Sequence, residues 1–237
     1  MGKPHVSIVI PAFNEERYIW ETFDSLSHQS YDDFETIVVD SYSTDSTVDI
    51  AKDFGARVLY APRGKIGLAR NVGAKAARGD IIVHASADVR YDKDWLMNLI
   101  RPIDDGRAHV AFGSIYVHKG NIIENGFAHI LNHAIVPFVT KVGMIYASGD
   151  NIASDAKFYH NIGGIREDLH TGEDVEFIKR AMRYGKVHFV KEAKAFTSPR
   201  RIRHWGYVRY FIFHFKNFLR TNKTGKGFDK YEPIREK

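Results

Sequence analysis

Asp88 follows the apolar run at residues 80–85, at the point where a buried strand is expected to end. A carboxylate there suits a hard cation such as Mg²⁺ or Mn²⁺, which commonly takes one or two carboxylates together with phosphates and waters. Ser86 offers a hydroxyl two residues earlier but lacks the charge of an aspartate. Because the chain has no cysteine, any metal site must use oxygen or imidazole ligands. We therefore predict a modest cation site at Asp88 that a bound nucleotide completes.

Asp40 ends a second apolar run and opens the polar loop at residues 41–47. Its carboxylate can accept hydrogen bonds from a base or a ribose, while the hydroxyls of Ser43 or Thr44 cap the next helix. A polar turn with an N-cap is an equally good explanation of residues 43–47. It explains Asp40 less well.

Arg63 and Lys65 lie on a glycine-containing loop, and Arg70 lies on the helix expected after it. Cations in this arrangement suit diphosphate oxygens. The spacings G-x-x-x-x-G-K-S/T and G-x-G-x-x-G are both missing, which weighs against a P-loop or a standard dinucleotide site. For Arg70 taken alone, a solvated helix position is an equal alternative.

Glu173 and Asp174 stand at the expected start of a helix, whose N-terminus favours the charged carboxylates. A carboxylate here can act as a general base toward a hydroxyl, although capping alone explains such a pair more often. Upstream, the glycines at 149, 163 and 164 predict tight turns where the backbone approaches a ligand or another strand.

The elements that must position these residues follow from alternating apolar runs and amphipathic stretches, the pattern of a parallel sheet with helices on its faces. We expect strands at 5–10, 34–39, 56–61 and 80–85, with helices at 17–28, 45–54 and 67–77. Further along we expect helices at 93–103 and 173–184, strands at 110–118, 187–190 and 193–197, and an apolar stretch at 126–146. Such a sheet binds ligands beyond the carboxyl ends of its strands, where residues 11–16, 40–44, 63–67 and 86–88 fall.

The net charge of +5 is unevenly distributed. Residues 199–237 hold eleven Lys or Arg against three Asp or Glu, a balance of +8, which leaves −3 for residues 1–198. This division weighs against a nucleic-acid partner and indicates an anionic partner for the C-terminal region. There is no long apolar leader and no uninterrupted apolar run of about 18 residues, so we expect a cytoplasmic protein.

Residues 198–206 are rich in Arg, and residues 205–220 mix aromatic with basic side chains. The first segment is suited to clamping a diphosphate or an acceptor phosphate, and the second is typical of a helix in a membrane interface. Packing on the sheet or a homodimer contact is as good an explanation of the second segment. If the second segment contacts a membrane, residues 200–220 would bind an anionic membrane surface, and the protein would lie at the inner face of the cell membrane. We then also predict a lipid-linked acceptor.

Taken in chain order, seven motifs resemble those of the family 2 glycosyltransferases with the GT-A fold. They are SIVIPAFNEE at 7–16, VVDSYSTDST at 38–47, GLARNVG at 67–73, GDIIVHASAD at 79–88, GDN at 149–151, GGIRE at 163–167 and GED at 172–174. The resemblance implies an α/β fold of GT-A type: a Rossmann-like, mostly parallel central sheet with helices on both faces, followed by a C-terminal amphipathic helix. It divides the chain into a glycosyltransferase domain at 1–200, with a nucleotide-binding half at 1–105 and an acceptor half at 106–200, and a basic aromatic helix and tail at 201–237.

The resemblance also implies an enzyme that transfers a sugar with inversion from a UDP- or GDP-sugar to a glycan or lipid-linked acceptor, with Mg²⁺ or Mn²⁺. Asp174 would be the catalytic base, beside Glu173, and Asp88 would hold the metal. The donor nucleotide would be bound by Pro11, Ala12, Phe13, Asn14, Glu15, Asp40, Ser41, Arg70, Ser86 and Ala87, with Asp40 on the base and Arg70 near the diphosphate. Contacts to the diphosphate or the acceptor would come from Gly149, Asn151, Arg200 and Arg201.

Three departures from the family pattern affect these expectations. Ser86 replaces the first acid of the usual Asp-X-Asp, Tyr42 stands in a loop that is commonly Asp-Gly-Ser, and residues 110–171 resemble the family only at their turns. Two alternatives stay open. A sugar-phosphate nucleotidyltransferase is disfavoured because residues 11–16 are acidic and lack glycine, and a non-catalytic GT-A-like binding protein at a membrane surface is disfavoured by the retained carboxylates.

Overall fold

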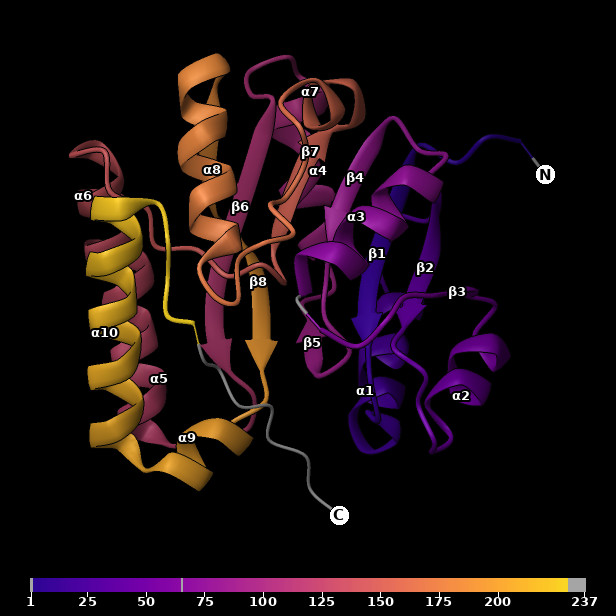
Figure 1. Cartoon of the computed structure of the whole chain (residues 1–237), viewed down its shortest axis with the longest axis horizontal. Helices are drawn as coiled ribbons and strands as arrows, with labels where there is room; N and C mark the ends of the chain where they lie inside the picture. Colours follow the sequence, from indigo (N-terminus) through magenta and orange to yellow (C-terminus); the bar gives the residue numbers. More distant parts are fainter. Residues whose placement is uncertain (1, 65, 230–237) are drawn as a thin grey trace.

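The computed structural model describes residues 2–64 and 66–229, and within them eight strands form one sheet in the order β3-β2-β1-β4-β7-β6-β8-β5 (Figure 1). Its first part is parallel. There β1 (Val6–Ala12) lies between β2 (Phe34–Asp40) and β4 (Ile81–His84), and β3 (Arg57–Tyr60) forms the edge. These four strands were predicted to within two residues at each end. Burial of β1, β4 and the second half of β2 produces apolar runs, while the edge strand β3 is half-buried.

The second part of the sheet is mixed. The strand β7 (Ile152–Asp155) runs antiparallel to both β4 and β6 (Val110–Val117), while β8 (Val187–Thr197) runs parallel to β6 and antiparallel to β5 (Val89–Tyr91). The predicted strands at 187–190 and 193–197 are one strand, with an irregularity opposite Gly113 and Ser114. With four parallel and three antiparallel pairs among the described residues, the prediction of a mostly parallel sheet is confirmed.

Helices cover both faces of the sheet, as predicted. On one face, α1 (Glu16–Ser27) and α4 (Trp95–Asp104) bury side chains such as Phe23 and Leu99. On the other, α3 (Ile66–Ala76), α7 (Ala156–Asn161) and α8 (Glu173–Tyr184) bury side chains such as Tyr159 and Phe177. The short α2 (Thr47–Asp53) connects β2 to β3. The sheet is packed between two apolar layers, and the loops at the strand ends extend from this packed sheet.

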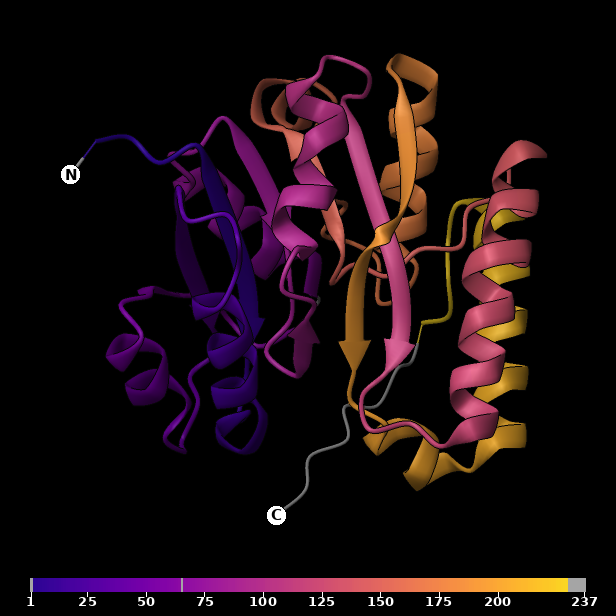
Figure 2. The same ribbon diagram turned by 180° about the vertical axis from the view of Figure 1, so that it is seen from behind.

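The apolar stretch predicted at 126–146 belongs to α5 (Ile122–Ile130), the π-helical turn η1 (Leu131–Ile135) and α6 (Val136–Lys141). The C-terminal region forms α9 (Arg200–Trp205) and α10 (Tyr207–Thr224). Figures 1 and 2 both show α10 beside α5 at one edge of the molecule, far from β3. The division into domains at residues 105 and 200 stays a prediction.

Contacts on two sides fix α10. The ring centroids of Phe127 and Phe211 are 4.7 Å apart, and the Tyr207 hydroxyl donates to Glu124 at 3.0 Å, which joins α10 to α5. On its other side, the Asn222 side chain exchanges hydrogen bonds of 2.8 and 2.9 Å with the backbone of Ile145, in the loop between α6 and β7. The C-terminal helix is therefore packed on the protein. Within the described ranges, none of the helices has the length and apolarity needed to cross a bilayer.

Candidate active site

A cleft of about 500 Å³ opens at the carboxyl ends of β1, β2 and β4 and is closed on its far side by α8, α9 and α10. Most of the predicted site residues line it: Pro11, Ala12, Phe13, Glu15, Ser41, Arg70, Ser86, Ala87, Asp88, Gly149, Glu173, Asp174, Arg200 and Arg201. Segments separated by more than 180 residues thus share one cavity. The strand-end rule correctly predicted that these loops meet at one edge of the sheet, and α10 adds cleft residues that were not predicted, including Tyr210, His214 and Asn217.

Three predicted residues do not line the cleft. Asp40 is fully buried and accepts hydrogen bonds from the Ser43 backbone and hydroxyl at 2.8 and 2.5 Å. Asn14 has φ +51° and accepts from the Thr44 backbone at 2.9 Å, which ties the first two loops together. In this structure both residues shape the loops, and their predicted contact with a nucleoside stays a prediction.

Asn151 is engaged on every side by the protein. Its Oδ1 accepts from the Trp95 indole at 2.8 Å, and its Nδ2 donates to the carbonyls of Ser114 and Ala193, both at 3.0 Å. Only 1% of its surface is exposed and it does not line the cleft, so in this structure it fixes the strand ends beside the site. The predicted contact of Asn151 with a diphosphate or an acceptor stays a prediction.

Arg200 connects two acidic residues of the cleft. Its guanidinium donates to both Glu15 oxygens at 2.7 and 2.9 Å and to Asp88 Oδ2 at 2.7 Å, and it lies 4.7 Å from the centroid of the Tyr18 ring. Burial alone would lower the pKa of Arg200, but the Glu15 hydrogen bonds and the Asp88 charge outweigh it and raise the pKa. Arg200 therefore stays charged and neutralises the carboxylate that was predicted to hold a metal.

Arg70 is a second buried cation that lines the cleft. Only 2% of it is exposed, and its Nη1 donates to the Ala85 carbonyl at 3.5 Å. Its Nε has no hydrogen-bond partner among the described residues. A Cβ added at Gly149 would come within 2.8 Å of Arg70 Nη2, so a larger residue there would displace the guanidinium. A buried cation with an unused donor is suited to an anionic ligand.

Asp174 and Glu173 begin α8 and face this cation. Asp174 accepts from the backbone N–H of Gly149 at 2.9 Å and of Val175 at 2.7 Å. Burial raises the pKa of Asp174, while those hydrogen bonds and the Arg70 charge oppose the rise. Burial and the Asp174 charge together raise the pKa of Glu173 to about 7. Glu173 is buried, Asp174 is half-buried, and both line the cleft, a position that capping alone does not require.

The raised pKa of Glu173 predicts a pH-dependent cost of folding. An unfolded Glu ionises near pH 4.5 and the buried one near 7, so the folded protein loses stability as pH rises through that window. Relative to wild type, Glu173→Gln should gain on the order of 2 kcal/mol of unfolding free energy between pH 5 and pH 8. Urea unfolding of both proteins at the two pH values measures this difference. A difference that is the same at both would contradict the assignment.

Comparisons with known proteins agree with this arrangement. The family model described as glycosyl transferase family 2 matches residues 7–163. An uncharacterised glycosyltransferase of Rickettsia felis is 26% identical over 204 residues, covering 78% of this chain and 33% of that protein. The poly(ribitol-phosphate) β-N-acetylglucosaminyltransferase TarS of Staphylococcus aureus is 27% identical over 186 residues, covering 74% and 32%. The chain thus spans about a third of the length of these relatives.

Solved structures share the fold. Residues 1–349 of S. aureus TarS in complex with UDP-GlcNAc superpose with a TM-score of 0.63 at 21% identity, covering 81% of this chain and 58% of that one. The mannosyltransferase PcManGT of Pyrobaculum calidifontis, in complex with GDP-Man and Mn²⁺, superposes with a TM-score of 0.70 at 22% identity, covering 96% and 66%. The predicted GT-A fold is confirmed by these neighbours. Since the family model covers about two thirds of the chain, the protein belongs to glycosyl transferase family 2.

Proposed function

We propose that this chain transfers a sugar from a nucleoside diphosphate sugar to an acceptor hydroxyl or lipid phosphate with inversion at the sugar carbon. The observation that carries the proposal is that three ionisable groups line one cleft: the carboxyl groups of Glu173 and Asp174 and the buried Arg70 guanidinium. Relatives that bind UDP-GlcNAc, UDP and GDP-Man support a UDP- or GDP-sugar as the donor.

The chemistry follows from these charges. Asp174 accepts the proton of the acceptor hydroxyl as the acceptor oxygen bonds to the sugar carbon, and the bond to the nucleoside diphosphate breaks on the opposite face. Arg70, with its unused Nε donor, offsets the negative charge that develops on the leaving diphosphate. A divalent cation bound at Asp88 would offset the same charge when present. A single displacement requires no covalent intermediate.

A donor panel tests the proposal. The protein is incubated with UDP-, GDP- and dTDP-sugars, with Mn²⁺ and with EDTA, and the released nucleotide is identified. Release of nucleoside diphosphate supports transfer. Release of pyrophosphate supports a nucleotidyltransferase instead, and donor binding without turnover supports a binding protein.

We further propose that α5, η1, α6 and α10 form a docking face for an anionic lipid surface. Large apolar side chains stand exposed along both helical segments, including Ile122 at 88%, Phe138, Val208 at 74% and Phe215. Residues 113–149 and 199–228 contain ten Lys or Arg and a single acid, Glu124, which is buried. Exposed apolar side chains flanked by bases and lacking acids suit the interface of an anionic bilayer. A cytoplasmic location at the inner membrane face stays a prediction.

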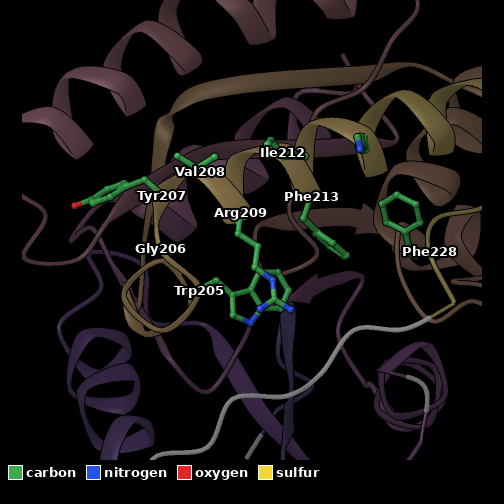
Figure 3. Close-up of a pocket in the computed structure, with 9 residues that line it drawn as sticks. Trp205, Gly206, Tyr207, Val208, Arg209, Ile212, Phe213 and Phe228 are labelled. Carbon is green, nitrogen blue, oxygen red and sulfur yellow. The ribbon is translucent and has the colours of Figure 1, made fainter.

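The apolar surface also reaches the cleft, which supports a lipid-linked acceptor. A shallow hollow of about 770 Å³ is lined by Trp205, Tyr207, Val208, Arg209, Ile212, Phe213, Lys216 and Phe228 (Figure 3). Phe213 lines both this hollow and the cleft. The apolar chain of a lipid-linked acceptor lying in the hollow would bring its polar end toward Asp174.

Sedimentation with liposomes tests the docking face. The double variant Val208→Glu/Phe215→Glu should bind vesicles containing phosphatidylserine at least about tenfold more weakly than wild type, because two apolar side chains are lost and two negative charges are added. Trp20→Glu, at an exposed aromatic residue of α1, is the matched control and should sediment like wild type. Equal sedimentation of all three proteins with the vesicles would contradict the proposed docking face.

A further inference from the structure

Asp150 carries a buried carboxylate that the proposed reaction does not use. It is 8% exposed and lines the cleft, and its Oδ1 has no hydrogen-bond partner among the residues the structure describes. Its one recorded side-chain hydrogen bond involves Ser148. Leaving a charged oxygen buried and unpaired is costly, so a bound ligand with positive charge is expected to satisfy it.

The position of Asp150 in the sheet is specific. The strands β4 and β7 are antiparallel, with His84 opposite Ile152. Continuing that register two residues past the strand ends brings Ser86 opposite Asp150. The Tyr91 hydroxyl connects the two residues, since it accepts from the Ser86 N–H at 3.0 Å and donates to the Asp150 carbonyl at 3.1 Å. A carboxylate therefore lies across from the position where the chain has serine in place of an acid.

Neither of the two arginines of the cleft described above has a recorded hydrogen bond with Asp150. Arg200 donates to Glu15 and Asp88, and Arg70 attracts Asp150 electrostatically without a recorded hydrogen bond between them. Nothing in the described part of the chain gathers three or more His, Asp or Glu side chains for a metal. Asp88 and Asp150 face the same cleft, and two carboxylates fit the needs of Mg²⁺ or Mn²⁺ when phosphates and waters complete the ligands.

We propose that Asp150 is the second carboxylate of the divalent-cation site, where it takes over from the acid that Ser86 replaces. The inference rests on the proposed function, because the nucleoside diphosphate of the donor supplies the remaining oxygens. Arg200 beside Asp88 weakens cation binding to the free protein by charge repulsion, so tight binding requires the diphosphate.

The test measures Mn²⁺ directly. Free Mn²⁺ is followed by its electron paramagnetic resonance signal while MnCl₂ is titrated into the protein saturated with UDP or GDP. Asp150→Asn should raise the Kd of Mn²⁺ at least about tenfold, as should Asp88→Asn. Asp105→Asn is the control because it removes an exposed carboxylate outside the cleft, and it should bind like wild type. Asparagine matches aspartate in shape, and thermal melting of each variant verifies its fold.

Moving the carboxylate from position 150 to position 86 provides a second, more specific test. The double variant Ser86→Asp/Asp150→Asn should recover most of the Mn²⁺ affinity, since it returns a carboxylate to the opposite side of the Tyr91 hydroxyl. Recovery supports the proposal, because a general loss of structure would not be reversed by an added charge. Wild-type Mn²⁺ affinity in Asp150→Asn overturns it, and so does wild-type protein that binds no Mn²⁺ with nucleotide present. Either result leaves the transferase proposal standing wherever the donor panel shows transfer.

Discussion

Asp174→Asn is expected to lower kcat for sugar transfer by about 10²–10⁴-fold, the range for loss of a positioned general base, while donor affinity stays within about threefold. The asparagine side chain can still accept the Gly149 N–H that holds Asp174 at 2.9 Å, so the loop keeps its place. It has no basic oxygen to take the acceptor proton. Steady-state rates of nucleoside diphosphate release, together with donor binding by calorimetry, separate the loss of chemistry from the loss of binding.

The neighbouring acids provide the controls. Asp168→Asn removes an exposed carboxylate that pairs with Arg166 in the loop before α8, and it should turn over like wild type. Glu173→Gln removes the carboxyl group whose pKa is raised to about 7 by burial and by the Asp174 charge, and it should shift the pH profile more than the maximum rate. Near-normal turnover by Asp174→Asn would remove Asp174 from the role of base.

The parallel half of the fold could be predicted because its signals are local. The strands β1 and β4 and the second half of β2 are buried on both faces and produce apolar runs, and the amphipathic helices fall between these runs. The strands β5 and β7 were not predicted. They are three and four residues long, and Ser154 and Asp155 give β7 a polar end, so only their pairing with β8, β4 and β6 defines them.

The same distinction explains the site. Asp88 and Ser86 were placed correctly because residues just past a parallel strand reach one edge of the sheet. Asp40 also stands at the end of a strand, but its carboxylate is buried and accepts two hydrogen bonds from Ser43. The strand pattern does not reveal this contact. Asp150 lies in the GDN motif at 149–151, but its proposed role was not predicted, since that role depends on the antiparallel register that places it across from Ser86.

The contact of Arg200 with Glu15 spans 185 residues and was also beyond prediction. It gives the second large expected effect: Arg200→Ala should lower the unfolding free energy by about 3–5 kcal/mol, the range for a buried ion pair that loses one partner. The side chains of Arg200 and Glu15 are 9% and 6% exposed, so the remaining carboxylate cannot recover its hydration. Urea unfolding at pH 7.5 measures the loss. Arg203→Ala, at an exposed arginine of α9, is the control and should stay within about 0.5 kcal/mol of wild type.

A double-mutant cycle distinguishes the ion pair from simple packing of the arginine side chain. If the cost of Arg200→Ala comes from the stranded Glu15 charge, adding Glu15→Gln should return a large part of the lost stability, because the glutamine is neutral. If the cost comes from lost packing against Tyr18, the two losses should add. Additive losses would therefore contradict the electrostatic account. Recovery would show that the cost of Arg200→Ala comes mainly from the charge that Glu15 keeps when its partner is lost.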